Sequence, residues 1–307
     1  MVMNISGATQ SYLGNLDRTQ QQINQAQAEV SSGYRVQTPS DDPAAISSIL
    51  QAQADEGANR QIQSNLGSVT NELGTADSAL QSAIQAVESA ITLAAQGANS
   101  TNTADENANI AQQVAGLQQT LVGISQTTFN GRYIFSGDQD AGPAYQLDSS
   151  QTEGVKQLIS APATRTIVDA TGTAISVAKT AQEIFDAKNG DGSVAAGNVF
   201  AAVNSLLTAL GANDQAGIAQ ASSALHSADT YLNGQLAFYG EAENRISAAT
   251  SLAQKFQTQQ QAQLGSLRDA DIPSVALQLS QAQLDQQAAL SAEANIEQSR
   301  NLFSYLG

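Results

Sequence analysis

The residues that could perform acid–base or nucleophilic chemistry are few in this 307-residue chain. His226 is the single histidine, so a Ser-His-Asp site would have to use it. It stands in an Ala/Ser-rich stretch typical of a helix, without the glycine motif of a nucleophile elbow. Cysteine is absent, which excludes disulfides, thiolate metal ligands and a cysteine nucleophile. The sequence therefore indicates no catalytic residue.

Two turn-forming stretches contain oxygen ligands of the kind that calcium prefers. They are Asp138 with Asp140, and Asn189 with Asp191. Neither stretch has the twelve-residue loop with a terminal glutamate, so we interpret both as turns. A phosphate-binding G-x-x-x-x-G-K-[ST] loop and a strand-anchored G-x-G-x-x-G motif are also absent. We expect no metal and no cofactor.

The charge balance argues against nucleic acid and membranes as partners. Lys and Arg number 12 against 28 Asp and Glu, which gives 12 − 28 = −16. An acidic chain without a basic cluster cannot neutralise phosphates, and an anionic membrane surface repels it. The first twenty residues have no basic segment followed by an apolar run, so we expect no cleaved secretory signal. The chain is then either a cytoplasmic acidic protein or one exported through an uncleaved N-terminus.

The elements that must position any functional residue are mainly helices. Heptad-like spacing of apolar residues predicts one helix over residues 5–31, closed by Gly33, and a last helix after Asp269–Pro273. The first has Ile5, Tyr12, Thr19 and Ala26 interleaved with Leu16, Ile23 and Val30. The last has Val275, Leu279, Ala282, Ala289, Ile296 and Phe303 on one face, with Leu306 near its end.

Strong start signals mark the second and third helices. Asp42 can cap a helix whose first residue is Pro43 and which runs to about Gly97. Thr103 and Glu106 form a capping box for a third helix through Ile124.

The middle of the chain loses the helical period. Asn130-Gly131 predicts a tight turn, and residues 132–137 form a short β-prone run. Residues 166–168 and 174–177 predict a hairpin within a strand-like region that extends from 138 to about 179. Helical patterns return at 181–187, at 199–210, near Asp214, and again over 236–267.

This layout predicts a mainly α protein, a long helical rod or coiled coil built from both chain ends, with a small β-rich insert. The expected segments are 1–42, which pairs with 270–307; 43–137 and 185–269, which form the rod; and 138–184, the β-rich insert. Each of these helices has only a narrow apolar stripe, which needs helices of neighbouring copies to bury it. Assembly is therefore the expected function. The expected assembly residues are Ile5, Tyr12, Leu16, Ile23, Val30, Leu279, Ile296, Phe303 and Leu306.

Several motifs resemble the bacterial flagellin superfamily, and within it the hook-associated branch. They are Glu29–Pro43, Asn130–Gly137, Gly240–Ile246, Asp269–Pro273 and the ending Asn301–Gly307. Ser136-Gly137 stands where that family more often has two glycines. The positions that match its motifs are Gly33, Arg35, Asp41, Asp42, Pro43, Arg132, Tyr133 and Phe135.

The resemblance implies a secreted structural adaptor in the bacterial flagellum, a ring between hook and filament. Its implied partners are further copies of itself, a first hook-associated junction protein, flagellin, and a flagellar export chaperone. It also implies terminal helices that form an inner coiled coil and are largely unfolded in the free monomer, and an insert, residues 138–184, that faces outward. Two alternatives stay open: flagellin itself, and a hydrolase carried on a helical scaffold.

Overall fold

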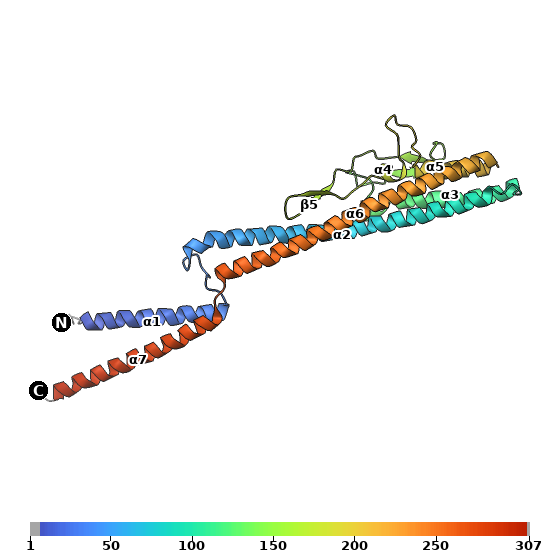
Figure 1. Ribbon diagram of the computed structural model, residues 1–307. Coiled ribbons are helices and arrows are strands. Elements are labelled where there is room, and N and C mark those ends of the chain that lie inside the picture. Colours follow the sequence, from blue (N-terminus) through green and yellow to red (C-terminus); the bar gives the residue numbers. More distant parts are fainter. Residues whose placement is uncertain (1–6, 306–307) are drawn as a thin grey trace. The chain divides into compact units, whose positions relative to one another are not determined.

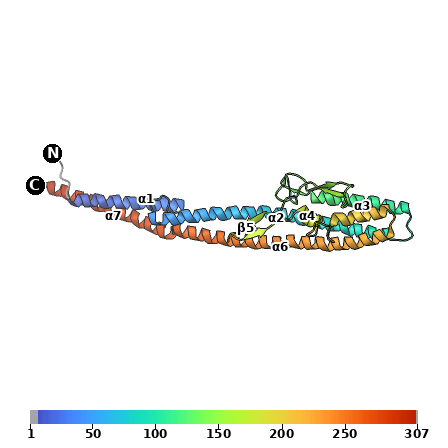
Figure 2. The same ribbon diagram turned by 90° about the horizontal axis from the view of Figure 1, so that it is seen from above.

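The computed structural model describes residues 7–305, and the side chains of residues 10–294 (Figures 1 and 2). Helices dominate this part of the chain, which confirms the predicted mainly α class. The helices are α1 (Gly7–Ser32), α2 (Pro43–Gly97), α3 (Ala104–Ser125), α4 (Ala181–Phe185), α5 (Val199–Gly211), α6 (Gln215–Arg268) and α7 (Ile272–Tyr305). The strands are β1 (Thr128–Phe129), β2 (Arg132–Tyr133), β3 (Tyr145–Leu147), β4 (Val155–Gln157), β5 (Thr166–Val168) and β6 (Ala174–Ser176).

Local signals explain where several helices begin. The predicted capping box of α3 is present, because the Thr103 hydroxyl accepts from the Glu106 amide and the Glu106 carboxylate accepts from the Thr103 amide. Thr180 and Glu183 cap α4 in the same way. The separate helical patterns expected near Asp214 and over 236–267 are one continuous helix, α6.

The chain divides into two compact units. Unit 1 comprises residues 1–58 and 257–307, and unit 2 comprises residues 59–256. Long helices α2 and α6 contribute to both, so the unit boundaries fall inside helices. The five predicted segments have different boundaries from these two units, for example 42/43 and 269/270. The division into those segments remains a prediction.

Unit 1 contains α1, α7 and the adjoining ends of α2 and α6. Helices α1 and α7 pack side by side (Figures 1 and 2). A separate small apolar cluster joins the N-terminal part of α2 to the C-terminal part of α6. Its buried members are Val36, Ile49, Ala52 and Leu264.

Unit 2 holds the larger core. In this unit α2 and α6 run antiparallel (Figure 1) and each presents buried residues seven positions apart, which we name the heptad rows. On α2 these are Leu66, Leu73, Leu80, Val87 and Ala94, and on α6 they are Ile218, Leu225, Leu232, Tyr239, Ile246 and Ala253. Helices α3 and α5 also pack against each other in this unit.

The strands within residues 7–305 form three separate antiparallel hairpins. Asn130 and Gly131 both have positive φ, 51° and 77°, as a tight hairpin turn between β1 and β2 requires. The predicted hairpin of β5 and β6 is confirmed, with Ile167 opposite Ile175. Pairing of β3 with β4 was not predicted. Every strand has two or three residues, so the insert consists mostly of loops.

A buried polar network fastens the loops of unit 2. The Tyr145 hydroxyl donates to Asp186 Oδ2 at 2.8 Å, and Asn198 Nδ2 donates to Asp186 Oδ1 at 2.7 Å. Lys188 Nζ lies 3.4 Å from Asp186 and 2.7 Å from Glu153. Burial, followed by the neighbouring Asp186 charge, raises the pKa of Tyr145 well above its usual range. The hydroxyl therefore stays protonated and remains a donor.

Candidate assembly surface

The predicted heptad stripe of α1 lies along α7 inside unit 1. Ile23 and Ala26 are buried, whereas Tyr12 and Leu16 are half-buried. The Tyr12 hydroxyl donates to the carbonyl of Ala289 at 3.1 Å, which ties the two helices together. On α7 the facing row has Val275 and Ala282 buried, and Leu279 and Ala289 half-buried. These residues thus form a seam within one chain.

The remaining predicted assembly residues fall elsewhere. Val30 has 38% of its surface exposed, so it does not share the burial of Ile23 and Ala26. Ile296 and Phe303 belong to helix α7, but their side chains lie outside the described ones. Ile5 and Leu306 lie outside the described residues. The assembly role assigned to all nine residues remains a prediction.

A second apolar row on α7 faces away from this seam. Leu277 and Leu284 are 70% and 63% exposed, and they stand seven residues apart, so they share one face of the helix. Leu290 is 51% exposed further along the same helix, and Leu13 of α1 is 46% exposed. The sequence analysis did not single these residues out, although the seven-residue spacing of two leucines was a signal that could have identified them.

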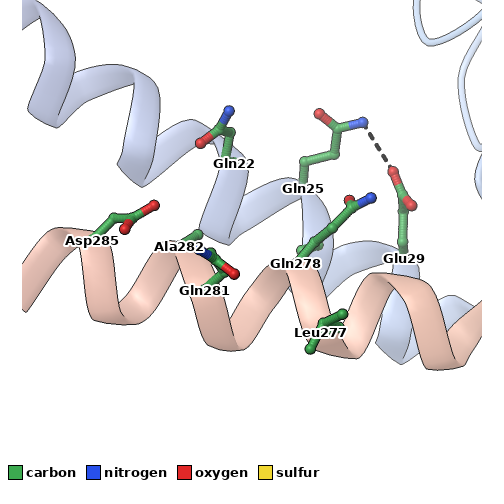
Figure 3. A pocket seen from close by; sticks show the side chains of 9 residues that line it. Gln22, Gln25, Glu29, Leu277, Gln278, Gln281, Ala282 and Asp285 are labelled. Carbon is green, nitrogen blue, oxygen red and sulfur yellow. Dashed lines mark hydrogen bonds between the residues drawn. The ribbon is translucent and has the colours of Figure 1, made fainter.

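A groove of 440 Å³ between α1 and α7 lies beside this row. Figure 3 shows the side chains that line it, among them Gln22, Gln25 and Glu29 from α1 and Gln278, Gln281 and Asp285 from α7. Leu277 also lines it. Gln25 Nε2 donates to Glu29 Oε1 at 2.9 Å. The groove therefore combines amide groups, which can both donate and accept, with an exposed leucine at its side.

The link between α1 and α2 carries most of the motif residues, and Arg35 is its main fastening. Gly33 ends α1 with φ of +77°, a conformation that glycine adopts without strain. Arg35 Nη1 lies 3.0 Å from Asp42 Oδ2, and its Nη2 donates to the Leu267 carbonyl at 2.8 Å. The Arg35 amide donates to the Arg268 carbonyl at 2.8 Å. One arginine thus ties residues 33–42 to the end of α6.

Two neighbouring carboxylates shape the rest of this link. Asp41 Oδ2 accepts from the amides of Gln37 and Thr38 at 2.9 and 2.7 Å. Asp42 Oδ1 accepts from the Ala45 amide at 3.1 Å and caps α2 ahead of Pro43, as predicted. Hydrogen bonds hold the pKa of both carboxyl groups below the usual range. The largest cause is the bond from the Thr38 amide for Asp41, and the bond from the Arg35 side chain for Asp42.

Aromatic contact completes the link in unit 1. The Arg268 guanidinium lies over the Tyr34 ring, 3.9 Å from its centroid, and Tyr34 forms a β-bridge with Asp269. The segment that follows α1 therefore meets the segment that precedes α7 through both side-chain and backbone contacts. Sequence reasoning found the motif residues but not these contacts.

The remaining motif residues belong to unit 2. Arg132 is exposed and lies 3.2 Å from Asp140, and the Tyr133 amide donates to the Asp140 carbonyl at 2.9 Å. Phe135 is fully buried and meets the rings of Phe185 and Tyr239 edge to face at 6.0 and 6.4 Å. Their described contacts lie in unit 2, so a direct role in the α1/α7 surface is not indicated.

Two features of the described part of the chain bear on function. No group of three or more His, Asp or Glu side chains gathers there as a metal site would require. None of the helices in residues 7–305 combines the length and apolarity of a membrane span.

Comparisons with known proteins agree with the motifs. Residues 3–140 match the bacterial flagellin N-terminal helical region. A protein from Vibrio parahaemolyticus, described as a flagellar hook-associated protein, has 20% identity and a TM-score of 0.65 over 75% of this chain and 100% of its own. Flagellar hook-associated protein 3 from Legionella pneumophila has 13% identity and a TM-score of 0.62 over 71% of this chain and 98% of its own. The search of curated proteins gives no match.

The family match covers residues 3–140 of the 307, so this N-terminal part of the chain is similar to flagellin, in agreement with the motifs. The fold of the chain is shared with FlgL-type hook-associated proteins; FlgL from Bacillus cereus has a TM-score of 0.51, at 14% identity over 64% of this chain and 98% of its own.

Proposed function

We propose that this protein is a structural adaptor of the bacterial flagellum that joins hook to filament by assembling into a ring through its terminal helices. The fold shared with hook-associated proteins supports this role over that of an enzyme. Its partners are further copies of itself, a first hook-associated junction protein on the hook side and flagellin on the filament side. A flagellar export chaperone would deliver it to the cell exterior without a cleaved signal peptide.

The observation that carries the proposal is the exposed row of Leu277 and Leu284. Burial of a leucine side chain contributes about 1.5–3 kcal/mol, so a row of them left open on a helix favours association. The adjacent groove, lined by Gln22, Gln25 and Gln281, offers amide partners for a neighbouring helix. Ring assembly would bury this row, whereas the seam around Ile23 is already covered within the chain.

Substitution of the exposed row tests the assembly role. In Leu277→Asp/Leu284→Asp, two charges replace apolar side chains that are mostly in solvent, so the melting temperature of the monomer should change little. Assembly should fail, because the charges would have to be buried between copies. We expect complemented cells to lose the swimming halo in soft agar, although the variant is made and exported.

The matched control is Leu147→Asp/Leu158→Asp, which changes two exposed leucines of unit 2, 41% and 44% exposed. This variant should swim normally. Normal swimming of the Leu277/Leu284 variant would show that the row is not an assembly surface.

A further inference from the structure

The heptad row of α2 in unit 2 continues, toward the start of the helix, into a buried polar residue. The heptad row of α2 begins at Leu66, and the position seven residues before it is Asn59. Asn59 is only 4% exposed, comparable with the apolar members of the row. An amide thus occupies a layer where the repeat otherwise places a hydrocarbon side chain.

The contacts of Asn59 bind one helix to a single carbonyl on the other. Its Nδ2 donates to the carbonyl oxygen of Ala253, the last residue of the heptad row of α6, at 2.8 Å. Gln63 Nε2 donates to the same oxygen at 3.2 Å from a half-buried position. The Oδ1 of Asn59 is buried and has no hydrogen-bond partner among the described residues.

We infer that Asn59 sets the register of α2 against α6 at this end of the seam. Apolar layers that repeat every seven residues pack almost as well after a slip of one heptad, so they specify register weakly. A slip that moved Asn59 from Ala253 to Ile246 would bury the whole amide unpaired. The Ile246 carbonyl already accepts the Thr250 hydroxyl at 2.9 Å. The observed register gives the amide nitrogen an acceptor that the slip toward Ile246 would remove, at the cost of one unsatisfied oxygen.

The absence of cysteine allows this register to be measured directly. Cysteines introduced at the exposed positions Gln61 and Ser251 would carry a spin-label pair across the seam. We expect one distance population in the parent chain. In Asn59→Leu we expect a second population displaced along the seam by about 10 Å, seven residues of helix rise. The melting temperature of this variant should not fall, because a core asparagine specifies register at a cost in stability.

Two further variants keep the test decisive. Asn59→Ala removes the amide without adding bulk, so it should show the second population even if leucine disrupts folding. Gln63→Leu removes the other amide that reaches the Ala253 carbonyl and should keep one population. A single population in both Asn59 variants would overturn the inference. A second population in Gln63→Leu as large as that in Asn59→Leu would overturn the assignment to Asn59.

Discussion

Asp41 and Asp42 are neighbours in sequence, yet different groups stabilise the negative charges of their carboxylates. Backbone amides of Gln37 and Thr38 are the main donors to Asp41, whereas Arg35 is the main partner of Asp42. Both pKa values are lowered in the folded chain. Such a carboxylate stabilises the fold fully above its unfolded-state pKa of about 3.9, and this contribution disappears as the pH falls through the lower, folded-state pKa. The link should therefore be at full strength near neutral pH and weaken in acid below about pH 4.

Replacement of the arginine separates the two carboxylates. In Arg35→Ala we expect the pKa of Asp42 to rise toward the usual value of 3.8, while that of Asp41 stays where it was. NMR titration of the labelled carboxyl carbons measures both values in one sample. Equal shifts of the two groups, or none, would show that Arg35 does not hold Asp42 as described.

Gly137 shows how a backbone position can require glycine. Its φ is +64°, and an added Cβ would lie 2.6 Å from the Pro162 carbonyl oxygen and 2.7 Å from that of Ala161. The preceding Ser136, where the family more often has glycine, is buried and its hydroxyl donates to the Gly142 carbonyl at 2.7 Å. The serine is therefore accommodated, but an alanine at 137 would not be.

The matched pair for this position is Gly131, which has φ of +77° and open space around its would-be Cβ. We expect Gly131→Ala to cost about 1 kcal/mol in the free energy of unfolding, from backbone strain alone. Gly137→Ala should cost about 3 kcal/mol or more, because backbone atoms must also move. Urea denaturation of the two variants checks the difference, and equal costs would contradict the close approach to Pro162.

Among the four long helices α1, α2, α6 and α7, α1 and α7 have the fewest buried apolar residues among the described side chains. Ile23 and Ala26 on α1, and Val275 and Ala282 on α7, are their buried apolar residues within the described side chains. We therefore expect amide hydrogens of α1 and α7 to exchange almost freely in the isolated monomer, while those of α2 within unit 2 and of α3 are protected. Exchange followed by mass spectrometry measures this. Strong protection of both terminal helices in a verified monomer would exclude folding coupled to assembly.

Helix starts and hairpin turns were predictable because their signals are local. Asp42 with Pro43, Thr103 with Glu106, and Asn130-Gly131 each set backbone geometry within a few residues. Among the described side chains, the predicted stripe of α1 is buried or half-buried from Tyr12 to Ala26. Beyond Ala26 the half-buried residue is Glu29, whereas Val30 is exposed, and the seven-residue repeat does not explain this difference.

Contacts across long sequence separations were not predictable from one sequence. Arg35 meets the Leu267 carbonyl 232 positions away, and nothing near either residue signals the other. Tyr145 and Asp186 similarly meet through loops whose pairing no periodicity reveals. The motif resemblance identified Arg35 as important, but the structure was needed to say what it holds.

At the scale of the whole molecule, the exposed leucine row and the thin terminal seam are the features on which the proposed assembly role rests. Its net charge of −16 keeps separate copies apart, so association needs a specific apolar contact. An adaptor also needs unlike neighbours on its two axial sides, whereas a filament subunit repeats the same contact indefinitely. This difference distinguishes the proposed role from that of flagellin.

Electron microscopy of cells lacking this gene tests the adaptor role most directly. The account predicts intact hooks without filaments, together with flagellin released into the medium, and recovery of filaments when the gene is restored. Normal filaments in the deletion strain would contradict it, as would the loss of hooks.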